Sequence, residues 1–293
     1  MLATFGERLQ GADITPISRA ALTRGKGPHH VPTRPDPTRP DLRASEEETQ
    51  AWYAEYYYSK LGRDRNDLLT NPEVLFQSIA FDVANTRALR RIPVDRESAR
   101  VLDVGCGGGT SLLTFLKLGF RAANLTGVDI NSARIHQGRM DLPGIDLRCE
   151  TADRMSFASG SFDIVFESTM FVQLTDERVA GSIALEMLRV TKPGGHLVLV
   201  DWRYSKPGSR DYLGMSTSRI AKLFDVGGTT QVVVSENGAL VPPIGRRISQ
   251  YCSPLYFPVQ KLFPFMVGQR TTVLKKRSHL PGKNDRPLRI EKR

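Results

Sequence analysis

A glycine-rich stretch at residues 101–110 (VLDVGCGGGT) has residue types suited to holding a cofactor. Apolar residues and Asp103 lead into glycines and then a helix-forming stretch, as in a buried strand that ends in a ligand-binding turn. Glycine tolerates positive φ and lets a ligand approach the backbone. A dinucleotide fingerprint needs Gly or Ala as the sixth residue, but counting from Gly105 the sixth is Thr110. Because Asp103 could meet an ammonium group at the strand end, the turn predicts a nucleotide that bears an amino acid.

A second acid follows at the spacing expected for a ribose contact. Residues 125–131 (LTGVDIN) form a predicted strand that ends at Asp129, about 20 residues beyond the glycine turn. At this spacing a carboxylate accepts hydrogen bonds from the two ribose hydroxyls. Asp129 is therefore a candidate nucleotide ligand.

From residue 101 to residue 202 the chain resembles the class I S-adenosylmethionine-dependent methyltransferases. Residues 152–154 (ADR), 162–167 (FDIVFE) and 188–195 (LRVTKPGG) match later family motifs in family order. The resemblance implies S-adenosylmethionine as cofactor and an adenine contact near residues 152–154. It implies these cofactor-binding residues: Asp103, Gly105, Cys106, Gly107, Asp129, Ile130, Asp153, Arg154 and Glu167.

Strand and helix patterns alternate along the chain, which predicts an α/β fold with a doubly wound parallel sheet. The resemblance implies seven strands, the last of which is antiparallel and lies between the fifth and the sixth. Ligands of such sheets bind beyond the carboxyl ends of the strands. This edge holds Asp103, Asp129, Glu167 and Asp201.

The predicted methyltransferase domain spans residues 45–277, between two tails expected to be disordered, 1–44 and 278–293. The first tail is rich in proline and arginine, and the second is basic. A capping box from Ser45 to Glu48 and an Asn71-Pro72 helix start predict a helical cap over residues 45–95. Residues 236–267 form an insert before the last strand that is too long for a plain hairpin.

Composition narrows the class of protein. The chain has 293 residues, of which 40% are hydrophobic, and its three cysteines are too few and too scattered for a disulfide framework or a zinc site. We expect no metal. Because no secretory leader or apolar run of about 18 residues stands out, we expect a cytoplasmic protein, peripheral to the membrane if the insert lies on it.

The net charge of +10 is concentrated in the C-terminal part. From Arg203 onward, seventeen Lys and Arg face five Asp and Glu, a surplus of twelve. A basic face can attract nucleic acid, anionic lipid or a phosphorylated substrate, but charge runs are more often only solvated. We expect no nucleic-acid partner, and the oligomeric state is left open.

Methyl transfer needs alignment more than acid-base groups, so few catalytic residues are expected. If the acceptor is a hydroxyl, Glu167 and Asp201 at the ends of the fourth and fifth strands are candidate bases. A cofactor or helix-cap contact is an equal alternative for Glu167. Gln173 stands where many small-molecule family members have histidine.

The acceptor is expected to be a polar small molecule or a glycan. Base N-methylation is disfavoured because residues 166–170 (FESTM) lack the required proline-containing tetrad, and no cysteine is placed for cytosine chemistry. Arginines and rings predict a polar acceptor, in weak resemblance to bacterial surface-glycan methyltransferases. The candidate substrate residues are Arg63, Arg65, Gln173, Trp202, Arg203 and Tyr256.

Two alternatives remain open at this point. The insert, with its aromatic residues and its prolines, can form a lid on the acceptor pocket or lie in a membrane interface. In the second case the acceptor would be a lipid or a quinone. A non-catalytic cofactor-binding protein of the same fold is the third class.

Overall fold

The computed structural model describes residues 68–205, 208 and 212–278. All of these lie in the larger of the two units of the chain, Arg34–Arg293. The predicted first cap helix, both predicted tails except Ser278, and the candidate substrate residues Arg63 and Arg65 fall outside the described residues.

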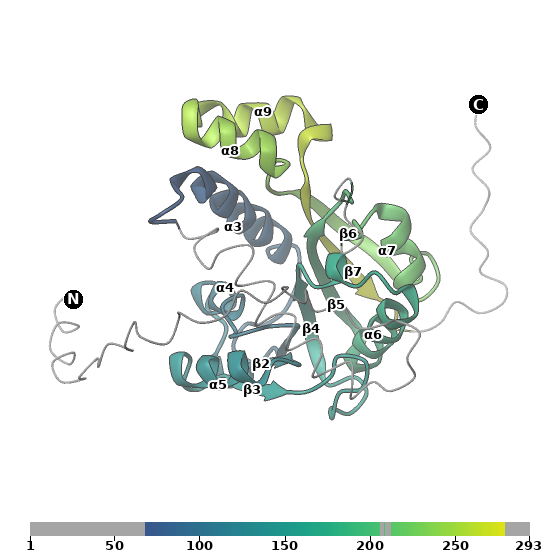
Figure 1. The fold of residues 1–293 in the computed structure, drawn as a ribbon. Coiled ribbons are helices and arrows are strands. Elements are labelled where there is room, and N and C mark those ends of the chain that lie inside the picture. The colour runs from purple at the N-terminus through teal and green to yellow at the C-terminus, as the bar shows by residue number, and fades with distance from the viewer. Residues whose placement is uncertain (1–67, 206–207, 209–211, 279–293) are drawn as a thin grey trace, which may run out of the picture. The chain divides into compact units, whose positions relative to one another are not determined.

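A seven-stranded sheet in the order β3-β2-β1-β4-β5-β7-β6 forms the centre of the fold (Figure 1). Strand β7 pairs antiparallel with both β5 and β6, whereas the pairs among β1 to β5 are parallel. The predicted fold class and the place of the last strand are therefore confirmed. The strands are β1 (Val101–Val104), β2 (Leu125–Asp129), β3 (Asp146–Cys149), β4 (Phe162–Ser168), β5 (Thr191–Trp202), β6 (Thr230–Asn237) and β7 (Gln269–Lys276).

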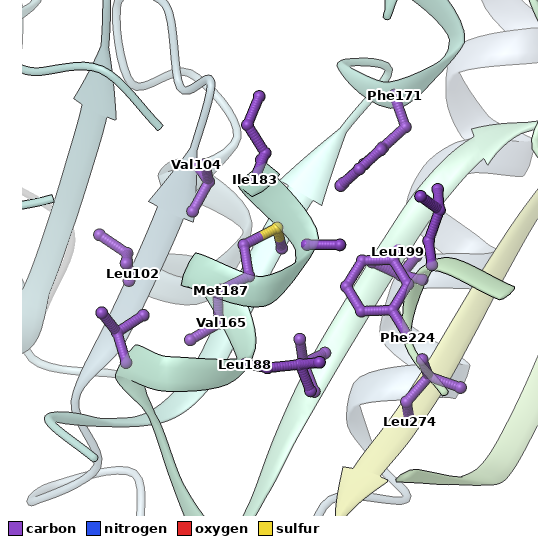
Figure 2. Close-up of a cluster of buried hydrophobic side chains, with 14 of the residues drawn as sticks. Leu102, Val104, Val165, Phe171, Ile183, Met187, Leu188, Leu199, Phe224 and Leu274 are labelled. Atoms are coloured by element: carbon purple, nitrogen blue, oxygen red, sulfur yellow. The ribbon is translucent and has the colours of Figure 1, made fainter. Parts of the chain in front are cut away.

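Helices cover both faces of the sheet, which explains why β1 is buried along its whole length. One face packs against α6 (Glu177–Val190) and α7 (Thr217–Leu223), and Figure 2 shows the apolar cluster between them. The other face packs against α3 (Leu75–Leu89), α4 (Leu112–Lys117) and α5 (Ser132–Asp141). Within the described ranges, no helix is long and apolar enough to cross a membrane.

Helix starts follow from local sequence. Asn131, Asp176 and Ser216 each precede a helix and accept a hydrogen bond from a backbone amide of its first turn. The predicted helix start at Asn71-Pro72 is present as a short 3-10 turn, η3 (Pro72–Val74), that continues into α3. These caps set where the chain turns back to the sheet.

The segment between β6 and β7 is helical and packs on the N-terminal part of the domain. It contains α8 (Pro242–Tyr251), η6 (Ser253–Leu255), α9 (Tyr256–Leu262) and η7 (Pro264–Met266). Tyr256 and Leu240 form a small core with Ala80 and Phe76 of α3. In Figure 1, α8 and α9 lie beside α3. Within the range predicted as an insert, Glu236 and Asn237 belong to β6, so the helical segment begins after that strand.

Candidate active site

The glycine turn after β1 has the backbone shape that its sequence predicts. Gly105, Gly107 and Gly109 have φ angles of 74°, 57° and 83°, in the left-handed region that L side chains rarely adopt. A Cβ on Gly105 would stand 2.9 Å from the sulfur of Met170. A Cβ on Gly107 would collide with the guanidinium of Arg134. Both positions need glycine for backbone conformation and for space.

Asp103 is a carboxylate held in the interior without a partner. It is 1% exposed, and neither of its oxygens accepts a hydrogen bond. Burial raises the pKa of Asp103 well above its usual range, the nearby charge of Asp129 raises it further, and the Ser111 side chain acts in the opposite direction without donating a hydrogen bond to it. A buried carboxyl with two free acceptor oxygens suits a cationic ligand group, such as the ammonium of an amino acid.

Asp129 supports the turn from the end of β2. Its Oδ2 accepts a hydrogen bond of 2.8 Å from the Gly107 amide, and its Oδ1 accepts one of 2.8 Å from the Asn131 amide. Each carboxylate oxygen keeps a second lone pair, so ribose hydroxyls can still donate to Asp129. The next residue, Ile130, is half-buried at the same strand end.

Cys106 packs beneath the turn. It is 4% exposed, and a Cβ on Gly127 would lie 2.7 Å from its sulfur, so that glycine makes room for the thiol. Burial, followed by the charges of Asp103 and Asp129, raises the pKa of Cys106 far above that of an ordinary thiol. The side chain is therefore a neutral packing group of the cradle.

Arg134 and Met170 contact the turn and were not singled out by sequence reasoning. Arg134 lies in the first turn of α5, which Asn131 caps, and Met170 follows β4. Both come from segments far from residues 105–107 in the chain. The sequence could have indicated these two residues only through their place, because the helix after β2 and the loop after β4 border the carboxyl edge of a doubly wound sheet.

Glu167 and Asp201 lie on the face of the sheet that packs against α6 and α7. They stand two positions after Val165 and Leu199, which belong to the apolar cluster on that face, and side chains two positions apart in a strand point to the same face. Glu167 is fully buried, and its Oε2 accepts a 3.2 Å hydrogen bond from the Met170 amide while Oε1 has no partner. Burial, and then the charge of Asp201, raises the pKa of Glu167 well above its usual range.

Asp201 is held by the backbone on both oxygens. It accepts hydrogen bonds from the amides of Val172, at 3.0 Å, and Trp202, at 2.8 Å. Burial raises its pKa to about 8, although these amides and the charge of Arg219 act in the opposite direction. Burial therefore favours the protonated form of Asp201.

Arg219 is a second feature that the sequence did not reveal. Arg219 is 8% exposed, and its guanidinium donates hydrogen bonds to the carbonyls of Phe171, Leu174 and Leu213. It also pairs with Glu177 at 2.8 Å. This arginine fixes the loop after β4 against the segment after β5, and so positions the amide that binds Asp201.

A cavity of about 120 Å³ lies beside Asp201, between α7 and the strands β5, β6 and β7. Its wall is largely apolar, with Leu199, Met215 and Ile220 among the lining residues. Arg203 and Arg270 add guanidinium groups. The cavity can therefore hold an apolar group with a polar end.

The other predicted substrate residues are spread around this edge. Gln173 is half-buried and donates to the Thr169 carbonyl, and the Trp202 ring packs 5.9 Å from that of Phe81. Tyr256 is fully buried, and its hydroxyl accepts a hydrogen bond from the Leu240 amide. Because its ring and hydroxyl are both used in the insert core, we leave Tyr256 out of the proposed site.

Asp153 and Arg154, predicted near the adenine, lie in the loop after β3. Asp153 is half-buried and Arg154 is exposed, so both remain reachable by a ligand at the ends of β1 and β2. Neither has a contact that fixes such a role, and they stay predictions.

Comparisons with known proteins match methyltransferases over the part of the chain that holds the glycine turn. A family described as a methyltransferase domain matches residues 101–195. The 2-methyl-6-phytyl-1,4-hydroquinone methyltransferase of Synechocystis sp. is 39% identical over 106 residues, which are 35% of this chain and 31% of that protein. The demethylmenaquinone methyltransferase of Renibacterium salmoninarum is 34% identical over 143 residues, 44% of this chain and 58% of that protein. The chain thus spans between about a third and three fifths of these relatives.

The fold also has solved neighbours. A Burkholderia thailandensis 1,6-didemethyltoxoflavin-N1-methyltransferase, with bound 1,6-didemethyltoxoflavin and S-adenosylhomocysteine, superposes with a TM-score of 0.51 at 14% identity. The match covers 80% of this chain and 88% of that one. At this identity it supports the fold.

Residues 101–195 match a methyltransferase domain, and this match supports an S-adenosylmethionine-dependent methyltransferase of class I, whose cofactor is S-adenosylmethionine. The residues present fit this cofactor. The unpartnered Asp103 suits its amino group, Asp129 can accept from its ribose, and the positive-φ glycines leave the backbone open to it.

Proposed function

We propose that this protein methylates a hydroxyl-bearing acceptor that carries an apolar tail, of the quinol or lipid class. The observation that carries methyl transfer is the cradle itself, with its unpartnered Asp103 beside Asp129 and the positive-φ glycines. The acceptor class is supported by the relatives, whose names specify a phytyl hydroquinone and demethylmenaquinone. The largely apolar cavity beside Asp201 suits part of such a molecule.

S-adenosylmethionine supplies a methyl group already activated on a sulfonium, so the protein chiefly aligns the acceptor and excludes water. Asp103 would hold the amino group of the cofactor and Asp129 its ribose, and Gly105 and Gly107 leave room for the cofactor. Arg219 fixes the loop after β4 through hydrogen bonds to the Phe171 and Leu174 carbonyls.

Asp201 is the candidate base for a hydroxyl acceptor. It lines the cavity, whereas Glu167 is enclosed by the sheet and by its bond to Met170. Its ionised form would accept the proton of the acceptor hydroxyl while the amides of Val172 and Trp202 hold its position. Since its pKa is raised to about 8, the reaction should become faster as the pH rises toward and beyond that value.

A glycan or another soluble polar acceptor is the second candidate. It is favoured by the two guanidinium groups of Arg203 and Arg270 at the cavity, because arginine forks bind oxyanions and sugar hydroxyls well. The two candidates differ in the apolar tail, which only the first requires.

The test supplies methyl-labelled S-adenosylmethionine and compares acceptors that differ in tail. A short-chain demethylmenaquinol, a phytyl hydroquinone and a soluble hydroxylated disaccharide are incubated with the full chain, and label in each is counted. We expect transfer to at least one tailed quinol, and loss of that transfer in Asp103→Asn. Label on the disaccharide alone would replace the first acceptor class with the second. No transfer to a broad acceptor panel, despite measured cofactor binding, would contradict the proposed activity.

A further inference from the structure

The segment between β6 and β7 exposes large apolar side chains to water. Five of its residues are more than two fifths exposed and are here called the insert surface: Tyr251, Leu255, Leu262, Phe263 and Phe265. Leu68, Leu69, Leu75 and Ile79 are also exposed, around η3 and the start of α3, which α8 contacts. Single exposed apolar side chains are normal, but a larger exposed apolar surface marks an interaction site.

The fold does not need these side chains for its own core. The inward side of the segment is already filled by Ala239, Leu240, Tyr256 and Val267, all of which are fully buried. The insert surface belongs to the same short helices but faces away from this core. The residues of the insert surface are therefore not needed for the packing that holds the segment on α3.

The most exposed part is held firmly at the edge of the sheet. Residues 261–265 (KLFPF) are exposed one after another, and the rings of Phe263 and Phe265 lie 6.0 Å apart. Arg203 donates to the carbonyls of Pro264 and Val267, and the Tyr204 hydroxyl donates to the Phe265 carbonyl at 2.9 Å. These bonds tie the apolar tip to the residues that follow β5, two and three positions beyond Asp201.

The charge of the segment has one sign. Residues 241–267 contain Arg246, Arg247 and Lys261 and no Asp or Glu. Arg247 and Lys261 are exposed, while Arg246 lies 4.0 Å from Glu73 of η3. Exposed aromatic and leucine side chains next to lysine and arginine are the composition of segments that lie in a bilayer interface.

We propose that the insert surface docks this protein on an anionic lipid bilayer, with residues 262–265 in the interface and Lys261 and Arg247 at the headgroups. The docking places the end of β5, and with it Asp201, beside the lipid surface. This inference goes beyond methyl transfer and does not depend on the acceptor. A second copy of the chain is the competing occupant of the same surface.

The experiment measures partition of the full chain onto vesicles of phosphatidylcholine with and without phosphatidylglycerol, without substrate. We expect binding to the anionic vesicles that weakens with salt. The double variant Leu262→Asp, Phe265→Asp should lower the partition coefficient at least ten-fold. Its control is Leu185→Asp on α6, because Leu185 is 66% exposed and Leu262 is 71% exposed. Lys261→Glu should weaken binding several-fold, and Lys117→Glu on α4 should change it less than two-fold.

Two results would overturn the docking. One is no binding of the wild-type chain to either vesicle, or an equal loss in Leu185→Asp. The other is concentration-dependent self-association that the double variant abolishes, without vesicle binding, which would assign the surface to a second copy. Calorimetry with S-adenosylhomocysteine on each variant reports on the cofactor site separately, so failure of methyl transfer and failure of docking are told apart.

Discussion

Three buried carboxyl groups lie at the ends of β1, β4 and β5. Asp103, Glu167 and Asp201 are each at most 3% exposed, and burial is the largest cause of the raised pKa of each. Such groups cost stability at neutral pH, and perturbed pKa values gather at functional sites. Of the three, only Asp103 has no partner on either oxygen, which makes it the residue most dependent on a ligand.

Replacing Asp103 with asparagine should separate binding from stability. We expect S-adenosylhomocysteine to bind about 1.5 to 3 kcal/mol more weakly, the range for hydrogen bonds to charged groups. Because the pKa of Asp103 is raised in the folded protein, its contribution to stability is present below about pH 4 and is lost as the pH rises toward the folded pKa. The variant should therefore gain stability relative to wild type as the pH is raised.

Calorimetry and urea denaturation at pH 5 and pH 8 check the two effects on the same samples. Weaker binding together with relative stabilisation at pH 8 supports a ligand-directed carboxylate. If the variant binds normally and is less stable at both pH values, Asp103 is only part of the core.

A pH profile tests the role of Asp201. In the wild type, kcat/KM for a hydroxyl acceptor should rise through an apparent pKa near 8, since the ionised form is the base. In Asp201→Asn this rise should disappear and the rate should fall by about 10²- to 10⁴-fold, the usual share of a general base. An unchanged profile in the variant would limit Asp201 to holding the amides of Val172 and Trp202.

At the scale of elements, the insert and α3 form one packed unit. Tyr256 is fully buried among Phe76 and Phe257, with ring centroids 5.7 Å and 5.6 Å away. Residues from both ends of the domain therefore share a core beside the end of β5. A tight hairpin in place of the insert would expose α3 as well as remove the insert surface, so point variants are the better probe.

Two tyrosines of the insert, one buried and one exposed, provide a matched pair of variants that tests this packing. Tyr256→Ala should lower the free energy of unfolding by about 4 kcal/mol, because it leaves a cavity and an unpaired Leu240 amide. Tyr251→Ala should change it by less than about 0.5 kcal/mol, because Tyr251 is 78% exposed. Urea denaturation gives both values. Similar losses in the two variants would show that the insert does not use Tyr256 as its anchor.

The sequence predicted well what is set by neighbours along the chain. The strand into Asp103 and the positive-φ glycines depend on local residues, and both are present. The family motif at residues 188–195 runs into β5, which is continuous from Thr191, with an irregular step in its pairing to β4. That continuity depends on pairing with a neighbouring strand, which local sequence does not show.

Contacts between distant segments were beyond sequence reasoning. Arg134 over Gly107, Met170 beside Gly105 and the carbonyl contacts of Arg219 each join segments that only the folded chain brings together. Tyr256 was predicted to contact the acceptor because it lies in a segment that contains many aromatic residues. Whether such a ring turns inward depends on α3, on which it packs.

At the scale of the whole molecule, the part of the chain that matches the methyltransferase family can be distinguished from the part that lies outside this match. The matched family covers residues 101–195, which form β1 to the start of β5 and include the proposed cofactor residues. The helical insert and the basic C-terminal surplus lie beyond that range. We propose that this chain shares its cofactor chemistry with the methyltransferase class and that its acceptor choice depends on the parts that follow β5.

Calorimetric titration of S-adenosylhomocysteine into the full wild-type chain tests the central claim most directly. The glycine turn, Asp103 and Asp129 predict one binding site per chain that weakens in Asp103→Asn. Circular dichroism on the same sample establishes that the protein is folded. Saturable heat with one site per chain is the expected result. No heat at millimolar ligand, with the protein folded, would contradict the assignment of the cradle and with it the proposed methyl transfer.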